Sequence, residues 1–218
     1  MIFYHGSKQI VNKPIAHGSN PENDYGASFY TTLDFESAKE WACKNNEVGL
    51  VNKYQIRGSD FNSLKILDLT NKDEYNILNW IAILMRFRNL DLKFRQLFDA
   101  RLKWLEKFYI DVNDYDVVKG FRADDAYFAF PQAFVMGQLS VERLQKVFVL
   151  GNLGIQYAFM SEKAISKIKF VSSQEIEQNY IGKYYGRIKS ATEEYRNILN
   201  EPIDDNETFI RDLMNKYE

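Results

Sequence analysis

Two spacings of apolar residues alternate along the chain, and each predicts a different kind of element. Short runs rich in β-branched and aromatic residues, bounded by glycine or polar residues, predict β-strands. These runs are Ile2–Tyr4, Ser28–Thr32, Gly49–Ile56, Leu64–Leu69, Tyr115–Gly120, Ile155–Met160 and Ile168–Val171. Apolar residues that recur every three or four positions predict helices. They do so over Phe35–Lys44, most of Phe128–Val147 and, briefly, Ser161–Ala164.

Residues 73–108 interrupt this strand-rich order with a longer helical pattern. Apolar residues at helical spacing occur over Tyr75–Met85 and again over Phe94–Leu105, which predicts a pair of helices inserted into the sheet or packed on it. From Gln174 onward the chain is charged and helical in pattern, and a last helix is expected to be capped within Asp204–Asn206. The apolar face of that helix would contain Phe209, Ile210, Leu213, Met214 and Tyr217.

This order of elements predicts the α+β class, with one main domain and a tail. The main domain spans residues 1–172 and carries the helical insertion at about 73–108, and the helical tail spans 173–218. Polar side chains stand where helices are expected to begin: Asp34 or Ser37 for the first helix, and Ser140 before Val141 for a later one.

Composition bounds the kinds of site that the chain can hold. Its 218 residues, 45% of them hydrophobic, suffice for a packed core. The net charge of −2 offers no global positive field for nucleic acid. Cys43 is the single cysteine, which excludes an internal disulfide and a cysteine-rich zinc site, and two histidines argue against a multi-histidine centre. We therefore expect no metal site.

The expected location is the bacterial cytoplasm. No apolar run approaches the roughly 20 residues of a membrane helix. The first residues lack the charged and apolar regions of a secretion signal. We expect no membrane partner.

Three motifs stand in the first forty-three residues. Tyr4–Ser7 reads Tyr-His-Gly-Ser, and Asp24–Thr32 ends in Phe-Tyr-Thr-Thr shortly after a glycine. Ser37–Cys43 then begins with Ser-Ala and carries Trp41. Taken singly, a histidine at a strand end or a tyrosine in an aromatic-rich chain is more often structural than functional. Their combination in this order is more specific.

In order and spacing these motifs resemble the ADP-ribosyltransferase superfamily, on the branch shared by diphtheria-type toxins and poly(ADP-ribose) polymerases. An Ala-Asp-Asp block at 123–125 and a Leu-Gly-x-Gln run at 153–156, followed by Ser-x-Lys-Ala at 161–164, extend the likeness. The chain is similar to a bacterial family of unknown function classed with that superfamily. The resemblance covers about residues 1–171 and implies a split mixed β-sheet with an NAD site.

The resemblance implies roles for the residues of the three motifs. Cleaving the bond between nicotinamide and ribose builds positive charge on the ribose. The site must therefore hold the nicotinamide flat, fix the riboses and stabilise that charge. His5 would bind a ribose hydroxyl, and Tyr30 and Trp41 would stack on nicotinamide. Gly6 would leave room for backbone contacts to the nicotinamide amide. Ser7 and Thr31 belong to the same motifs.

The expected late-strand glutamate is absent. In the resembled branch a glutamate contacts the ribose and stabilises the transition state, and the best candidate at that place here is Gln156. Glutamine can bind a hydroxyl but brings no negative charge. Asp124 or Asp125 could supply the charge, with Arg122 on a phosphate. Alternatively, an aspartate of this block caps the following helix and pairs with Arg122.

We therefore expect an enzyme that takes NAD as substrate and transfers one ADP-ribose to a macromolecular acceptor, protein or nucleic acid, with release of nicotinamide. Enzymes of this kind in bacteria are often toxins or effectors held in check by a small inhibitory partner. The alternative is a catalytically inactive module of the same fold that binds NAD, another nucleotide or a protein, and Gln156 favours it. A third reading is NAD hydrolysis without an acceptor.

Overall fold

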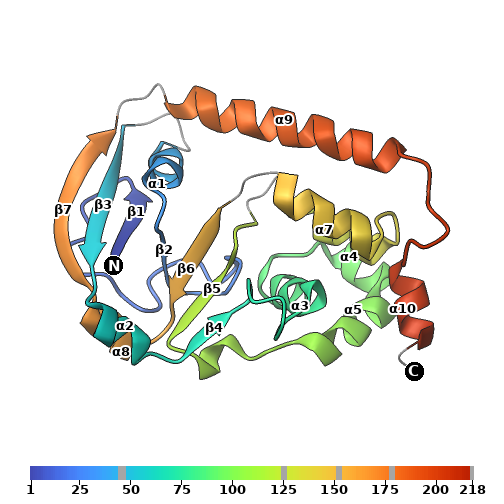
Figure 1. Cartoon of the computed structure of the whole chain (residues 1–218), viewed down its shortest axis with the longest axis horizontal. Coiled ribbons are helices and arrows are strands. Elements are labelled where there is room, and N and C mark those ends of the chain that lie inside the picture. The colour runs from blue at the N-terminus through green and yellow to red at the C-terminus, as the bar shows by residue number, and fades with distance from the viewer. Residues whose placement is uncertain (44–47, 124–126, 151–153, 177–179, 217–218) are drawn as a thin grey trace.

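One seven-stranded mixed sheet organises the molecule (Figure 1). The computed structural model describes residues 1–43, 48–123, 127–150, 154–176 and 180–216. The strands follow the order β4-β5-β6-β2-β1-β3-β7, and β4 and β5 are parallel while the other neighbours are antiparallel. The strands are β1 (Ile2–Ser7), β2 (Phe29–Thr32), β3 (Gly49–Gln55), β4 (Ile66–Asp68), β5 (Val117–Phe121), β6 (Ile155–Phe159) and β7 (Lys169–Ile176).

The sheet is nearly divided between β1 and β2. These strands share a single register pair, Tyr4 with Thr32, whereas β1 pairs with β3 at six positions. The two halves, β4-β5-β6-β2 and β1-β3-β7, therefore diverge beyond this pair. The divergence matters because a sheet that opens in its middle leaves space for side chains of both central strands to line a cavity.

The helices cover the two faces of the sheet unequally (Figure 1). Helix α1 packs on β1 and β3, and α2 and α8 pack together at the lower end of the sheet in Figure 1. Helix α9 runs along the top of the view from α1 to α7, and the other helices lie beside β4, β5 and β6. None of the described helices combines the length and apolar character needed to cross a bilayer. The helices are α1 (Phe35–Ala42), α2 (Gly58–Asn62), α3 (Ile77–Phe87), α4 (Leu92–Leu97), α5 (Asp99–Leu105), α6 (Ala129–Met136), α7 (Val141–Leu150), α8 (Glu162–Lys167), α9 (Tyr180–Asn200) and α10 (Ile210–Lys216).

Alternate residues of the central strands enter different cores. Val118 of β5 and Ala158 of β6 pack into the larger core, formed with α3, α5, α6 and α7. Their neighbours Val117 and Phe159 enter the smaller core, formed with α2 and α8 on the other face. This follows from the two-residue period of a strand, and it explains why both strands read as nearly continuous apolar runs.

The predicted α+β class and the seven strand positions are confirmed. Residues 73–108 contain α3, α4, α5 and a 3₁₀ turn instead of a helical pair, because Asp91 starts a new helix by accepting from the Lys93 and Phe94 amides. Helix α2 was not predicted. Strand β7 extends to Ile176, so α9 begins at Tyr180 and not at Gln174.

Caps and breaks explain the other boundaries. Asp34 caps α1, accepting from the Glu36 and Ser37 amides, and the Ser140 hydroxyl accepts from the Arg143 amide in the first turn of α7. Gly137, with φ of 76°, ends α6 in the left-handed region and so divides the predicted Phe128–Val147 helix. The expected cap within Asp204–Asn206 is wrong. Asp204 accepts from the amide of Asn206 in a turn, and α10 starts only at Ile210.

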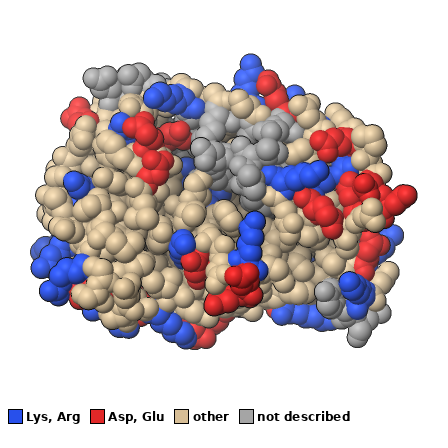
Figure 2. Space-filling model, in the orientation of Figure 1, with Lys and Arg blue, Asp and Glu red and all other residues tan. Residues whose placement is uncertain are grey.

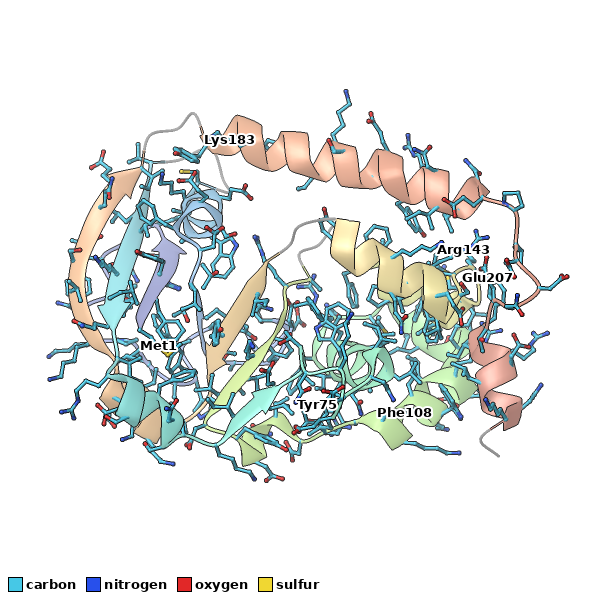
Figure 3. The ribbon with its side chains drawn as sticks, viewed as in Figure 1. Met1, Tyr75, Phe108, Arg143, Lys183 and Glu207 are labelled. Atoms are coloured by element: carbon cyan, nitrogen blue, oxygen red, sulfur yellow. The ribbon has the colours of Figure 1, made fainter. Side chains whose placement is uncertain are left out.

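The helical tail is tied to the main body by a buried ion pair. The Arg143 guanidinium of α7 binds Glu207 at 2.6 Å and donates to the carbonyls of Ile198, Glu201 and Pro202 (Figure 3). Ile198 of α9 and Ile210 of α10 are buried in the larger core. Ile210, Leu213 and Met214 form the expected apolar face of α10, and Tyr217 lies outside the described residues.

Candidate functional site

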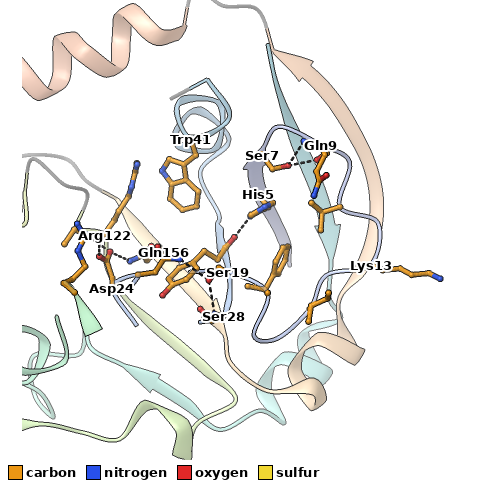
Figure 4. A pocket seen from close by; sticks show the side chains of 18 residues that line it. His5, Ser7, Gln9, Lys13, Ser19, Asp24, Ser28, Trp41, Arg122 and Gln156 are labelled. Atoms are coloured by element: carbon orange, nitrogen blue, oxygen red, sulfur yellow. Dashed lines mark hydrogen bonds and ion pairs between the residues drawn. The ribbon is translucent and has the colours of Figure 1, made fainter. Parts of the chain in front are cut away.

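A cavity of about 550 Å³ opens where β1 and β2 diverge (Figure 4). Its wall is built from both central strands, from the loop between them at residues 9–28, from α1, and from the chain following α3, β5 and the start of β6. The volume lies in the range of small-molecule and cofactor sites. Of the residues predicted to form a site, His5, Ser7, Tyr30, Trp41, Arg122 and Gln156 line this cavity.

His5 links the two halves of the sheet at the cavity. Its ring nitrogen Nδ1 lies 2.7 Å from the carbonyl oxygen of Tyr30. His5 directly follows Tyr4, the residue of β1 that pairs with β2. A carbonyl oxygen only accepts, so Nδ1 carries the proton and Nε2 is left as an acceptor. Burial lowers the pKa of His5, and the bond to Tyr30 opposes this only in part. The imidazole is therefore neutral at pH 7.

Tyr30 is held rigidly by its hydroxyl group. The hydroxyl donates to the Gly26 carbonyl at 2.8 Å and accepts from the Tyr25 amide at 2.9 Å. Burial raises its pKa well above the usual value, so the phenol stays protonated. These two bonds connect the ring of Tyr30 to the loop segment that also carries Asp24.

Trp41 and Arg122 meet across the cavity from α1 and the end of β5. The guanidinium carbon of Arg122 lies 4.8 Å from the centre of the Trp41 ring, a cation–π contact. The indole Nε1 of Trp41 is buried and has no hydrogen-bond partner among the described residues. Buried donors are almost always paired, so this one is an exception.

Gln156 does not stand alone at the catalytic position predicted for it. It is 4% exposed, and its amide nitrogen donates to Asp24 Oδ2 at 2.7 Å and to the Phe121 carbonyl at 3.3 Å. It occupies this place because β6 lies between β2 and β5, where Gln156 is in register with Thr32 and Gly120. The negative charge that the sequence lacks at this strand position is thus present beside it, on Asp24 (Figure 4).

Asp24 is a buried carboxyl in the cavity wall. Besides Gln156, its Oδ2 accepts from the Ala123 amide at 2.8 Å, and Oδ1 lies 3.4 Å from Nη1 of Arg88. Burial raises its pKa to about 6, although the Ala123 amide, Arg88, Gln156 and Arg122 all favour the charged form. Asp24 is therefore mostly ionised at pH 7.

The sequence reasoning missed Asp24 and Arg88. Asp24 begins the Asp-Tyr-Gly run of the second motif, and an aspartate close to a glycine is the feature of the sequence that points to it. Arg88 follows α3, and nothing in its sequence context indicates a site. Asp124 and Asp125, expected to supply the charge, lie outside the described residues.

Two other predicted residues have structural roles that the structure explains. Thr31 is fully buried, and its hydroxyl donates to the Tyr157 carbonyl at 3.2 Å in the β2–β6 pair, away from the cavity wall. At Gly6, a Cβ atom would lie 2.2 Å from the Ala38 carbonyl oxygen and 2.6 Å from the Ala42 nitrogen. The close approach of α1 therefore requires glycine at this position.

Replacing Gly6 with alanine should lower the free energy of unfolding by about 2–3 kcal/mol, because backbone atoms of α1 would have to move. Gly58→Ala is the matched control, since a Cβ at Gly58 meets nothing within 4 Å and the change should stay within about 1 kcal/mol. Urea denaturation of both variants measures the difference. Equal stability of Gly6→Ala and the wild type would contradict the packing of α1 on β1.

Charged side chains of both signs line the cavity. Among the described residues that line it, Arg88 and Arg122 are cations and Asp24 is a carboxylate, whereas the side chain of Lys13 points away from the cavity in Figure 4. On the face of the molecule seen in Figure 2, acidic and basic side chains are interspersed. Within the described part of the chain, no group of three or more histidine, cysteine, aspartate or glutamate side chains is placed to hold a metal ion.

Comparison with known proteins gives a family for the chain. Residues 1–170 match the family described as "Protein of unknown function (DUF3990)", and the chain belongs to this family. The match ends within β7, so α9 and α10 lie beyond it. No curated protein and no solved structure matches the chain.

Proposed function

We propose that the protein is an NAD-dependent mono-ADP-ribosyltransferase, which transfers ADP-ribose from NAD to a macromolecular acceptor and releases nicotinamide. The observation that carries the proposal is the convergence of His5, Tyr30, Trp41 and Gln156 on one cavity: three come from elements within the first 42 residues, and Gln156 comes from the distant strand β6. All four belong to the motifs whose order and spacing resemble the ADP-ribosyltransferase superfamily.

The charge of the cavity supports a dinucleotide ligand. The pyrophosphate of NAD carries two negative charges, and two arginines, Arg88 and Arg122, are among the residues that line the cavity. Arginine suits phosphate oxygens because its donors form a fork. We assign the pyrophosphate to the side of the cavity that holds Arg122 and Arg88.

The aromatic and histidine side chains support the rest of the ligand. Neutral His5 offers Nε2 as an acceptor for a ribose hydroxyl. Tyr30 presents a ring fixed by two hydrogen bonds, which suits stacking on nicotinamide. Arg122 lies against one face of the Trp41 ring. We therefore assign the other face of Trp41 to closing the cavity.

Incubation of the purified protein with adenylate-labelled NAD and a bacterial lysate tests the transfer. We expect label in a macromolecule, and sensitivity of the label to protease or to nuclease identifies the acceptor class. Absence of transfer, together with absence of nicotinamide release, would contradict the proposal.

Replacing His5 with alanine should weaken NAD binding about tenfold or more and reduce the labelling in proportion, because a ribose hydroxyl loses its acceptor. His17→Ala is the matched control. His17 is the other histidine of the chain, lies exposed in the β1–β2 loop and does not line the cavity. Equal loss in both variants would contradict a specific role of His5. Thermal unfolding of the variants shows whether the β1–β2 link survives the change.

A catalytically inactive NAD-binding module is the second candidate. Gln156 favours it, since the position carries no charge and its amide is engaged with Asp24. This candidate predicts saturable NAD binding that depends on His5, without nicotinamide release under any condition.

A further inference from the structure

A carboxylate on the cavity wall has no part in the nucleotide binding described so far. Asp24 is 5% exposed and lines the cavity beside Gln156. One of its oxygens, Oδ2, is held by two short N–H donors, from Ala123 and Gln156. The other, Oδ1, has the 3.4 Å contact to Arg88. A carboxylate oxygen can accept two hydrogen bonds, so Oδ1 retains acceptor capacity while Oδ2 fixes its position.

The contacts that Asp24 makes offset only part of the cost of its burial. Burial raises the pKa of Asp24 to about 6, and the surrounding donors and arginines reduce that effect only in part. Carboxyl groups with a raised pKa in the wall of a cavity are typical of functional sites.

Gln156 holds Asp24 by a hydrogen bond. Its amide nitrogen is shared between Asp24 and the Phe121 carbonyl, and its backbone is fixed by pairing with β2 and β5. The side chain of Gln156 therefore orients the carboxylate. This arrangement explains how a glutamine can stand where the resembled branch has a glutamate.

We propose that Asp24 is the catalytic carboxylate of NAD cleavage and that Gln156 is the positioning residue that holds it; this inference rests on the proposed function. The bond between C1′ of the nicotinamide ribose and the nicotinamide nitrogen breaks, and its electron pair leaves with nicotinamide. The Asp24 carboxylate stabilises the positive charge that develops on C1′ and the ring oxygen. A lone pair of the acceptor forms the new bond to C1′, and the proton of the acceptor passes to solvent.

Asp24→Asn tests the catalytic role, because asparagine keeps the shape of the side chain and an acceptor for the Ala123 amide. We expect the rate of nicotinamide release to fall about 10²–10³-fold, while the Kd for NAD stays within about threefold of the wild type. A wild-type rate in Asp24→Asn would overturn the inference and leave the proposed function standing. A wild-type protein that releases no nicotinamide would overturn both.

Gln156→Glu separates this inference from the simpler idea that the chain only lacks a glutamate. A second carboxyl group within hydrogen-bond distance of the first cannot ionise independently, and the donor to the Phe121 carbonyl is lost. We expect the rate at pH 7 to fall about tenfold. An increase of tenfold or more would overturn the assignment to Asp24.

The pH dependence of the rate in the wild type and in Gln156→Ala distinguishes Asp24 from its neighbours, and it also serves if Asp24→Asn fails to fold. Arg88 and Arg122 stay charged over the working range, and burial raises the pKa of Tyr25 and Tyr30 far above it. Burial lowers the pKa of His5, and its protonation also reduces the rate at acid pH; Gln156 donates to Asp24, so the change in Gln156→Ala separates the two groups. The wild-type rate should fall below about pH 6, where Asp24 takes up its proton. Gln156→Ala removes a donor that favours the carboxylate, so the fall should move to higher pH. An unmoved profile would overturn the inference.

Discussion

Replacing Tyr30 with alanine reduces the rate of nicotinamide release about a thousandfold, the largest loss that we expect from any single change. The variant loses the aromatic ring assigned to nicotinamide, an interaction of about 1–3 kcal/mol when compared with the stacking of bases on aromatic residues. It also loses the hydroxyl group that binds the Gly26 carbonyl and the Tyr25 amide. Those bonds hold the loop segment that carries Asp24, so binding and turnover are both affected.

Tyr30→Phe is the matched control, because it keeps the ring and removes only the hydroxyl group. We expect the Kd for NAD to stay close to that of the wild type and the rate to fall about tenfold, since the loop around Asp24 loses two hydrogen bonds. Stopped assays of nicotinamide release, with NAD binding measured in parallel, separate the two contributions. Equal rates in Tyr30→Ala and Tyr30→Phe would contradict the stacking role.

Asp24→Asn gains stability relative to the wild type as the pH rises, by about 2 kcal/mol between pH 4 and pH 7. The pKa of Asp24 rises from 3.8 to about 6 on folding, chiefly because of burial. Between these values the unfolded chain releases its proton while the folded chain retains it, so the wild type becomes less stable as the pH rises through this window. A pKa difference of about two corresponds to about 3 kcal/mol in all, most of which falls between pH 4 and pH 7. Asparagine carries no such proton.

Asp116→Asn is the control, with the opposite sign. Burial of Asp116 favours its neutral form, but hydrogen bonds from Lys163, Ser161 and the Lys65 amide outweigh it and hold the pKa at about 2. The stability that Asp116 contributes is therefore present above pH 4 and lost as the pH falls towards 2. Relative to the wild type, Asp116→Asn should lose stability as the pH rises through that window. Urea denaturation at a series of pH values measures both variants, and parallel curves would contradict the account of Asp24.

The fold was largely predictable because its strands and helices have regular apolar periods. Val117 and Val118 are β-branched residues in a short apolar run, which predicts a buried strand. Ser140 stands just before a helical pattern, which predicts a cap. The boundaries that failed depend on tertiary contacts. Strand β7 continues to Ile176 because β3 offers it a pairing partner up to Gly49, and no local pattern reveals that.

The candidate site was predictable only in part, for a related reason. His5, Tyr30 and Trp41 stand in short motifs of fixed spacing, and these motifs can be recognised locally. The link between Asp24 and Gln156 joins residues 132 positions apart. It arises from the register of β6 beside β5 and β2, together with the path of the β1–β2 loop. Arg88 reaches the same place from the end of α3. Neither the contact of Asp24 with Gln156 nor its contact with Arg88 can be recognised from a local pattern in the sequence.

The most direct test of the central claim is a calorimetric titration of the purified wild-type protein with NAD, repeated with His5→Ala. The account predicts one NAD bound per chain, saturating at micromolar to low millimolar concentrations, and clearly weaker binding to His5→Ala. A wild-type protein that gives no binding signal at millimolar NAD would contradict the assignment of the cavity to this dinucleotide.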